Sequence, residues 1–332
     1  MHVDRGVATA AFLVAMAMLG VAGAVVVVRQ HPSAGASPAA GPSPPPHHLL
    51  RTPYGSGGFL RGQPAAQTKA ALGRSFAKDY SHQYVTTGYA WLAITDANTP
   101  TPATLFQIPG LAALPAEEAD YAFADFYAFD VGTHHDAATP QEVVNWIHDN
   151  AGVAYLARPL AAPALDPSQI EAIRGLDGIQ IYDARLVRDQ PAQADAGQLW
   201  DQLLTAGDHV WGLVADDSQD TFGPSSTVGQ TSVDAQVASP DPVLIADALR
   251  RGAFVDSAGV HILEVAATGD TITVTTADAD QVTFVGSGGR TLATVAGARA
   301  AYRVHWDEGY VRAVATRAGG GRAWSQPVWV VP

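Results

Sequence analysis

Five polar residues directly follow predicted strands, and their types decide what chemistry this chain can do. They are Asp96, Arg158, Asp183, Asp216 and Asp217. In parallel α/β barrels the strands end at one face, and that face carries the reactive residues. Carboxylates gathered there with imidazoles would bind a divalent metal. No histidine stands next to any of these five residues, so the pattern predicts an acidic pocket without the usual nitrogen ligands.

Apolar runs that alternate with helix signals must position these residues. The runs that we interpret as strands are 90–95, 126–131, 153–157, 178–182 and 209–214. Thr139-Pro140-Gln141-Glu142 predicts a helix start, with a Thr N-cap, proline at the first helical position and Glu three residues after the cap. Asp166-Pro167 repeats this signal, 199–206 is helical, and another helix is predicted from Asp241-Pro242 to Arg251. Strand–helix units of this length indicate a parallel α/β barrel or sheet.

The pattern changes near Val260, where short alternating segments replace the strand–helix units. The segments are 262–265, 271–275, 282–285, 302–305, 310–316 and 327–331. Most are separated by Gly or Asp turns, which predicts a small β-sandwich of about 75 residues. We therefore expect four regions, which are an anchor or signal segment (1–30), a Pro/Ala/Ser-rich tether (31–55), an α/β barrel (56–257) and an all-β module (258–332).

The segment from Gly6 to Val28 is unbroken and apolar, with Thr9 as its only hydroxyl residue. As a helix with a rise of about 1.5 Å per residue it would span about 34 Å, enough for a hydrocarbon core of about 30 Å. Ala22-Gly23-Ala24 offers a small-x-small cleavage site, but the next four residues continue the apolar run. We expect an uncleaved transmembrane anchor, with cleaved secretion as the alternative, and the folded part outside the cytoplasm.

The composition limits the classes of partner. The 332 residues carry a formal net charge of −13 and include only two lysines, Lys69 and Lys78. We therefore expect no nucleic-acid partner, because phosphate binding needs a basic face. Cysteine is absent, which excludes disulfides and thiolate metal sites. The expected partners are the membrane, through the anchor, and an unidentified ligand or protein.

Several pieces between Leu60 and Arg251 resemble the PHP family (polymerase and histidinol phosphatase). Among them are the run from Gly88 to Asp96 and the tripeptide Ile108-Pro109-Gly110. The other matching pieces are 144–159, 176–182 and 199–218, and the tail pieces 309–312 and 322–327 are similar to a β-module in one branch of the family. The resemblance implies a distorted seven-stranded α/β barrel that binds up to three divalent metals and hydrolyses phosphate esters.

The first half of that family's metal-ligand pattern is lost in this chain. Its opening His-x-His motif corresponds to Ala65 and Gln67, and the aspartate that follows shortly corresponds to Leu72. The histidine of a Thr-Asp-His motif is Ala97, and the glutamate of a Pro-Gly-x-Glu motif is Ala112. Alanine and leucine offer no ligand atom, and a glutamine amide is no substitute for neutral imidazole.

The second half of the ligand pattern keeps one acid. The next family histidine corresponds to Asp125, the Ala-His-Pro motif reads Ala157-Arg158-Pro159, and the last Asp-x-His pair keeps Asp217 but has Gln219. Arg158 places a permanent cation where a metal was held, and it would repel a divalent ion. We therefore expect no metal cofactor and a catalytically inactive protein. The expected vestigial pocket consists of Asp96, Asp125, Arg158, Asp216, Asp217 and Gln219.

Alternatives remain open at this pocket. Arg158 would either bind an anionic ligand or pair internally with Asp96 or Asp217. A single relocated zinc or manganese ion would be held by Asp217 and Asp96 with His134 or His135, and would support phosphoester hydrolysis. A third hypothesis gives the binding function to the β-module, as a cell-surface adhesion or glycan-binding unit with the barrel as scaffold. The favoured hypothesis is a PHP-like pseudoenzyme, displayed outside the membrane, that binds a ligand or partner.

Overall fold

The computed structural model describes residues 49–331 of the chain. The helices are α1 (Ala77–Thr86), η1 (Ala103–Leu105), α2 (Pro140–Asp149), α3 (Pro167–Glu171), α4 (Ala184–Asp189), η2 (Pro191–Gln193), α5 (Gly197–Ala206), α6 (Pro242–Arg251) and η3 (Ser287–Gly289). The strands up to residue 258 are β1 (Leu49–Arg51), β2 (Leu60–Gln63), β3 (Trp91–Ala93), β4 (Ala112–Leu114), β5 (Ala116–Asp120), β6 (Asp125–Phe129), β7 (Val153–Ala157), β8 (Gly178–Asp183), β9 (Trp211–Ala215), β10 (Ser232–Ala235) and β11 (Phe254–Ala258). The later strands are β12 (Ile262–Thr268), β13 (Thr271–Thr276), β14 (Gln281–Gly286), β15 (Arg290–Ala296), β16 (Arg299–Arg303), β17 (Tyr310–Thr316), β18 (Arg322–Ser325) and β19 (Val328–Val331).

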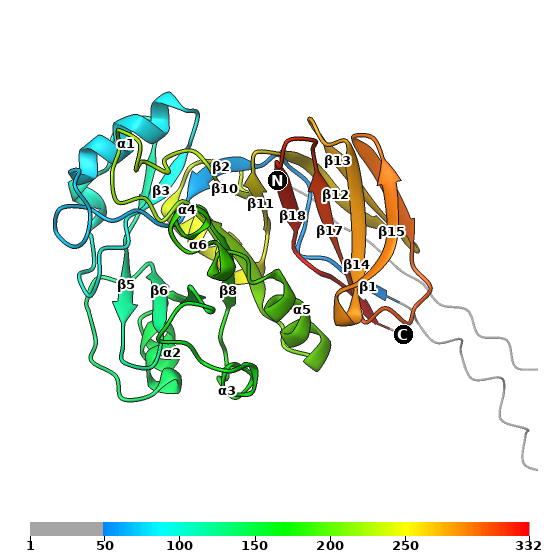
Figure 1. Cartoon of the computed structure of the whole chain (residues 1–332), viewed down its shortest axis with the longest axis horizontal. Helices are drawn as coiled ribbons and strands as arrows, with labels where there is room; N and C mark the ends of the chain where they lie inside the picture. The colour runs from blue at the N-terminus through cyan, green and yellow to red at the C-terminus, as the bar shows by residue number, and fades with distance from the viewer. Residues whose placement is uncertain (1–48, 332) are drawn as a thin grey trace, which may run out of the picture. The chain divides into compact units, whose positions relative to one another are not determined.

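The described strands form three sheets in a mixed α/β fold. An eleven-stranded sheet has the order β1-β19-β17-β18-β11-β10-β2-β3-β4, with β14 beside β17 and β15 beside β14. A five-stranded sheet has the order β5-β6-β7-β8-β9, and a three-stranded sheet has the order β12-β13-β16 (Figure 1). The predicted α/β class is confirmed, but none of these sheets closes, so the predicted seven-stranded barrel is not observed.

Two features keep the α/β sheets apart. Pro115 separates β4 from β5, and because proline lacks an N–H it cannot continue a strand ladder, so the chain passes from the first sheet into the second. At the other end, the free edge of β9 is paired with side chains instead of a strand. The N–H of Gly212 donates to Gln326 Oε1 at 2.9 Å, and that of Val214 donates to Asp256 Oδ1 at 3.1 Å.

The predicted helix starts are confirmed by their caps. The Oγ1 of Thr139 accepts from the Glu142 N–H at 3.3 Å, and α2 packs its buried Val143, Val144 and Ile147 against the main core. The Asp241 carboxylate caps α6, accepting from the Val243 N–H at 2.8 Å. Asp166 forms a reciprocal capping box at the start of α3. These local signals anchor the helices beside the two sheets that carry the acidic residues (Figure 1).

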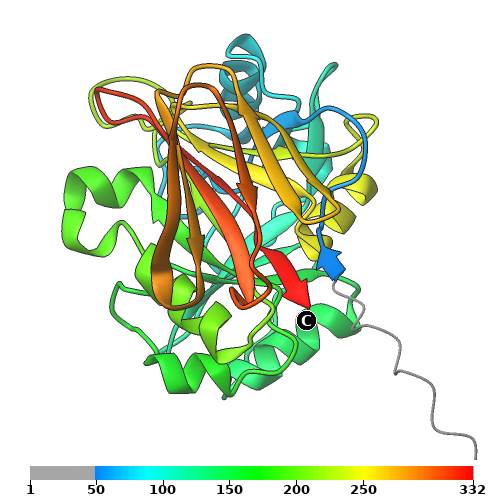
Figure 2. The ribbon, with the colours of Figure 1, turned by 90° about the vertical axis from the view of Figure 1, so that its right-hand side faces the viewer.

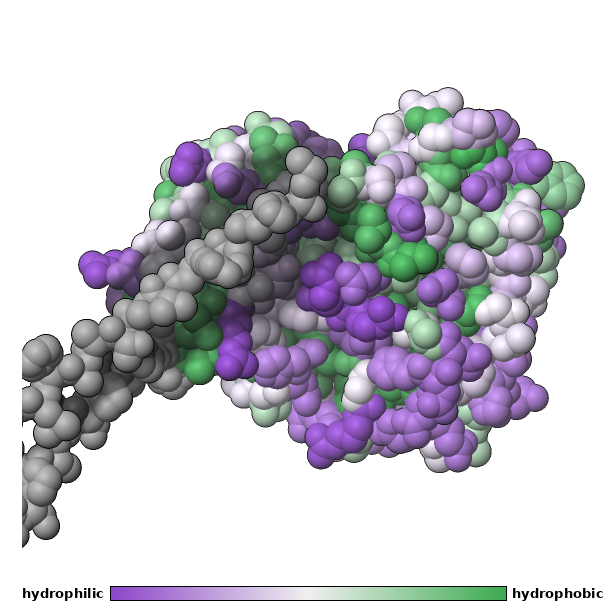
Figure 3. Space-filling view, turned by 180° about the vertical axis from the view of Figure 1, so that it is seen from behind, coloured by the Kyte–Doolittle hydropathy of each residue, from purple (hydrophilic) through white to green (hydrophobic). Residues whose placement is uncertain are grey.

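The six strands predicted after Val260 are all present, and the sequence pattern missed β15 and β18. The three-stranded sheet lies beside the strands around β14 and β17 (Figure 2). Their side chains share one apolar core, whose fully buried members include Val274, Phe284 and Val311. The predicted boundary between residues 257 and 258 falls inside β11, which pairs with β18, so the large sheet continues across it. The face in Figure 3 is mainly hydrophilic, with small hydrophobic groups between the polar ones.

The structure corrects the prediction of a transmembrane helix as far as it describes the chain. Within residues 49–331 no helix is long and apolar enough to cross a membrane. The apolar segment 6–28 and the first part of the predicted tether lie outside the described residues. The last part of that predicted tether contains β1, which pairs antiparallel with β19.

Candidate functional site

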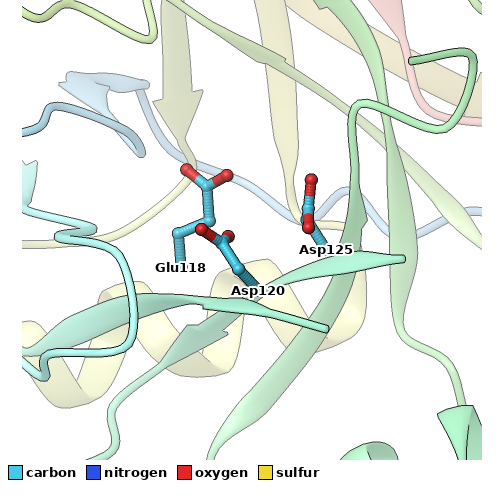
Figure 4. Close-up of side chains that lie close together, drawn as sticks. All are labelled: Glu118, Asp120 and Asp125. Carbon is cyan, nitrogen blue, oxygen red and sulfur yellow. The ribbon is translucent and has the colours of Figure 1, made fainter. Parts of the chain in front are cut away.

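Three carboxylates lie together on two paired strands of the α/β part. Glu118 and Asp120 belong to β5, and Asp125 begins β6, which pairs with β5 so that Asp120 is opposite Asp125. Carboxylate oxygens of the three residues all lie within 4.8 Å of one another (Figure 4). Glu118 is fully buried, and Asp125 is 9% exposed. The antiparallel pair of β5 and β6 therefore supplies acids to this pocket, in addition to the ends of parallel strands.

The guanidinium of Arg158 lies among these acids. Its Nη2 contacts Glu118 and lies 2.7 Å from Asp125 Oδ2, while its Nη1 is 3.6 Å from Asp217 Oδ2. The Arg158 N–H donates to Gln180 Oε1 at 2.8 Å, which fixes the residue just after β7. Acids from β5, from β6 and from the segment after β9 therefore surround one cation. Arg158 pairs internally, as one of the two alternatives predicted, with Asp217 as one of its partners.

A second arginine neutralises Asp217 from the other side. Arg185 of α4 places its Nε and Nη2 at 2.9 and 2.5 Å from Asp217 Oδ2. The backbones of Arg158 and Asp217 have φ angles of 40° and 44°, in the left-handed region. For non-glycine residues such conformations cost about 1–3 kcal/mol each and persist only where surrounding contacts impose them. The ion pairs with the two arginines are contacts of that kind.

Two of the degenerate ligand positions, Gln67 and Ala97, contact Glu118, and two others, Ala65 and Ala112, are buried. The Nε2 of Gln67 donates to Glu118 Oε2 at 2.7 Å, so the amide presents a hydrogen-bond donor to the acids. Ala97 forms an isolated parallel bridge with Glu118. Ala65 is fully buried, and Ala112 lies in β4 with 5% exposure. At these positions the chain thus supplies a donor or a methyl group in place of a metal ligand.

Two predicted positions contribute no side-chain contact to the pocket. Leu72 is 63% exposed. Gln219 is half-buried, and its main-chain carbonyl accepts from the Arg74 N–H at 2.7 Å. Leu72 lies in the loop after β2, and Gln219 lies in the loop after β9. In a loop, the position in a sequence motif does not determine where the side chain points.

Asp96 and Asp183 are occupied with local hydrogen bonds. Asp96 accepts from the N–H and the hydroxyl of Thr68 at 2.5 and 2.7 Å and from the Thr101 hydroxyl at 2.9 Å. Asp183 caps α4 by accepting from the Leu186 N–H at 2.8 Å. These bonds use the lone pairs that a metal would need. Asp96 therefore organises its loop and forms no ion pair with Arg158.

Asp216, next to Asp217, points to a different set of donors. It is fully buried and accepts from the Tyr84 hydroxyl at 2.8 Å, from the Gly229 N–H at 2.7 Å and from the Thr231 N–H at 2.6 Å. Burial raises its pKa to about 6, and the Tyr84 bond opposes that rise. Asp216 thus fastens the loop before β10 to helix α1 and takes no part in the arginine cluster.

Burial sets the electrostatics of the cluster. It raises the pKa of Glu118 to about 8, with Arg158 acting in the opposite direction. It also raises the pKa of Asp183 to about 7, and the charge of Asp217 raises it further. Burial disfavours the Arg158 cation, but Glu118 and Asp217 outweigh it and keep the pKa of Arg158 above its ordinary range. Arg158 therefore favours the ionised form of Glu118, against the effect of burial.

A multinuclear metal site does not fit these residues. Glu118, Asp120 and Asp125 have the oxygen donors that hard cations prefer. However, Arg158 already contacts two of them, and the Gln67 amide donates to Glu118. A divalent ion at this point would face a guanidinium and an N–H donor, both of which repel it.

The two histidines of the predicted relocated site lie elsewhere. His134 Nδ1 lies 2.9 Å from Glu117 Oε2, and the His135 ring stacks on Trp146 at 5.7 Å. Successive residues of a strand point to opposite faces, so Glu117 and its histidine lie on the other face of β5 from Glu118. The structure does not bring these histidines together with Asp96 and Asp217. Among the described residues, the one group that could hold a metal is the Glu118, Asp120 and Asp125 cluster.

Three residues of the site were missed in the sequence. Glu118 and Asp120 lie in the run Ala116–Asp120, whose three acids are more typical of an exposed loop than of a buried strand. Arg185 lies in α4 and is separated from the Asp183 cap by one residue, Ala184. A cue for Arg185 was its place directly after a strand end, where side chains reach the same face as the other acids.

Comparisons with known proteins give solved structures only, since neither a family model nor a curated protein matches the chain. One similar structure is a two-domain protein from Bacteroides vulgatus ATCC 8482 that contains a predicted PHP-like metal-dependent phosphoesterase (10% identity, TM-score 0.48, 84% of this chain and 88% of that one). Another is the lesion-specific endonuclease EndoQ from Pyrococcus furiosus (8% identity, TM-score 0.40, 59% and 56% covered). The first of these structures is described as PHP-like, and PHP is the family that the sequence motifs resemble.

A third similar structure corrects the prediction of no nucleic-acid partner. It is Endonuclease Q in complex with a 27-mer duplex substrate that has an abasic lesion (9% identity, TM-score 0.41, 58% of this chain and 56% of that one). That protein binds a duplex, and the prediction for this chain rested on net charge alone, whereas a binding face depends on the local distribution of charge.

Proposed function

We propose that this protein is a catalytically inactive PHP-like protein in which Arg158 takes the place of the metal ions. The observation that carries the proposal is the ion-pair contact of one guanidinium with Glu118, Asp125 and Asp217. A guanidinium is always charged and supplies several fixed donors, so it can neutralise acids from several strands as a metal would. Unlike a metal, it cannot activate water as a nucleophile. The pocket would keep its structure and lose the family's chemistry.

We also propose that the α/β sheets are the two halves of the predicted barrel, opened at both seams. Isolated parallel bridges join them, between Ala66 and Ser218 at one seam and between Ala97 and Glu118 at the other. Both bridges lie at strand ends beside the acidic cluster. This arrangement would explain how a pocket typical of barrels forms between sheets that do not close.

The direct test measures metal content and turnover on the same sample. The protein is incubated with Zn²⁺, Mn²⁺ and Fe²⁺, desalted, and subjected to elemental analysis and to assays with phosphomonoesters and phosphodiesters. We expect less than about a tenth of an equivalent of metal per chain and no hydrolysis. One equivalent of retained metal together with metal-dependent turnover would overturn the proposal.

A second candidate function is phosphoester hydrolysis with a single metal at Glu118, Asp120 and Asp125. It is favoured by the convergence of their oxygens within 4.8 Å. Binding there would require Arg158 to leave Glu118 and Asp125. The same experiment distinguishes the two functions, because Asp120→Asn would abolish any metal retained at this cluster. Asp120 has no ion pair with Arg158 among the described residues, so this variant leaves the arginine contacts in place.

A further inference from the structure

A cleft with two indole rings and two arginines lies away from the acidic pocket. Its volume is about 420 Å³, and it is lined by Arg51, Thr52, Pro53, His209, Trp211, Arg251 and Trp329. Trp211 opens β9, whereas Asp217 follows the carboxyl end of the same strand. Six residues at about 3.3 Å each separate the two by about 20 Å. The cleft is therefore independent of the acidic pocket and of the function proposed for it.

The aromatic walls of the cleft are fixed by their own contacts. Trp211 donates from Nε1 to the Arg250 carbonyl at 3.0 Å. Its ring lies over Gly252, where an added Cβ would lie 2.4 Å from the indole. On the other side, Trp329 stacks with His209 at a centroid distance of 4.0 Å and contacts the edge of Tyr310 at 6.2 Å. Rings held in this way lose little further freedom when a ligand binds.

The charges at the rim of the cleft oppose the acidity of the whole chain. Arg51 is exposed, and its side chain makes no hydrogen bond or ion pair within residues 49–331. Arg251 pairs with Asp247 at 2.6 Å, but both side chains are about half exposed, so the pair is weak and open to competition. His209 and two arginines thus line one cleft of a chain that carries 19 Lys and Arg residues and 32 Asp and Glu residues.

We propose that this cleft binds an acidic sugar, a pyranose ring with a carboxylate or phosphate group. The apolar C–H face of the ring would pack on Trp211 and Trp329, as aromatic side chains favour. The anionic group would be bound by Arg51 and Arg251, whose planar guanidinium groups match carboxylate and phosphate. Arg51 and Trp329 come from the paired strands β1 and β19, so both ends of the described chain build the cleft.

The test uses the full chain and four probes in ligand-observed NMR titrations. The probes are galacturonate and glucose 6-phosphate as acidic sugars, glucose as the neutral sugar, and benzoate as the aromatic anion. We expect binding of at least one acidic sugar, at least about tenfold weaker binding of glucose, and weaker binding of benzoate. Failure of both acidic sugars, or equal binding of glucose or benzoate, would overturn the proposal. A preference for galacturonate over glucose 6-phosphate, or the reverse, identifies the anionic group.

Variants locate the binding in the cleft. Arg51→Gln should weaken the acidic sugar about tenfold and leave any glucose binding unchanged, and Trp329→Ala should weaken both sugars. Arg299→Gln is the matched control, because Arg299 is an exposed arginine on a different strand. Since Trp329 packs on Tyr310, loss of binding in Trp329→Ala counts only if far-UV circular dichroism shows an intact fold. Unchanged binding in Arg51→Gln would place the sugar elsewhere and overturn the proposal.

Discussion

Arg158 is the residue on which the acidic pocket depends most strongly. In Arg158→Ala, Glu118, Asp125 and Asp217 would lose their shared cation. Removal of one partner from a buried ion pair costs about 3–5 kcal/mol, because the remaining charge is left uncompensated. We expect the free energy of unfolding at neutral pH to fall by about that amount in urea titrations. Because Glu118 and Asp125 then lack a cation while Asp217 keeps Arg185, Mn²⁺ should raise the midpoint of thermal unfolding of this variant and leave that of the wild type unchanged.

The control for that experiment is Arg188→Ala. Arg188 pairs with Asp189 at 2.6 Å, but both side chains are about 40% exposed, so its loss should cost less than about 1 kcal/mol. The same stabilisation by Mn²⁺ in the wild type would contradict the view that Arg158 excludes the metal. A destabilisation of Arg158→Ala no larger than that of Arg188→Ala would show that the cluster does not depend on its cation.

Glu117 should make stability depend on pH. Burial raises its pKa from 4.5 to about 7, and His134 acts in the opposite direction. The folded state therefore binds this proton more tightly than the unfolded chain, so the contribution to stability is full below pH 4.5 and is lost as the pH rises toward 7. In Glu117→Gln the fall in stability between those pH values should be less steep, by at most about 1.4 kcal/mol per pH unit.

Urea unfolding at a series of pH values measures this slope. Glu264→Gln is the matched control, because Glu264 is exposed on β12 and the change removes the same ionisable group. The control should retain the slope of the wild type. If Glu117→Gln and the wild type lost stability in parallel as the pH rose, Glu117 would not be the group that titrates.

At the scale of elements, helix α2 shows what a local signal can do. Thr139 caps it through the hydrogen bond from the Glu142 N–H to Oγ1. We expect Thr139→Ala to lower the free energy of unfolding by about 1 kcal/mol, because one of the first N–H groups of the helix loses its acceptor. Thr139→Ser keeps the hydroxyl and should lose much less. Equal losses in the two variants would assign the effect to packing of the threonine methyl group.

The elements that could be predicted are those whose signals lie within a few residues. Helices α2 and α6 begin with a cap followed by proline, and both were found. Helix α1 was missed because the residue before it is Phe76, which offers no polar side chain as a cap. Strand β5 was missed because its acids resemble a loop, and only its pairing with β6 and burial beside Arg158 make it a strand. The acidic site was only partly predicted for the same reason. The contacts of Arg158 join segments that are far apart in the sequence, and no local signal reveals them.

At the scale of the molecule, a buried ion pair joins the α/β part to the later strands. Asp201 of α5 accepts from Arg312 Nε and Nη2 at 2.8 and 2.7 Å and from the Tyr310 hydroxyl at 2.8 Å. The Arg312 guanidinium also lies over the Trp200 ring at 4.9 Å. Asp201 is 7% exposed and Arg312 is 5% exposed, so water screens the pair little. Together with the pairing of β11 and β18, this contact should make residues on both sides unfold together.

Arg312→Leu tests that coupling. The change leaves Asp201 buried with Tyr310 as its remaining donor, and it should lower the free energy of unfolding by about 3–5 kcal/mol. Asp201→Asn with Arg312→Leu, which removes both charges, should recover part of that loss, because no unpaired charge remains. Urea unfolding followed by far-UV circular dichroism and by tryptophan fluorescence should give coincident transitions in the wild type and both variants. Two separated transitions in the wild type would mean that the two parts fold independently, and that the ion pair does not couple them.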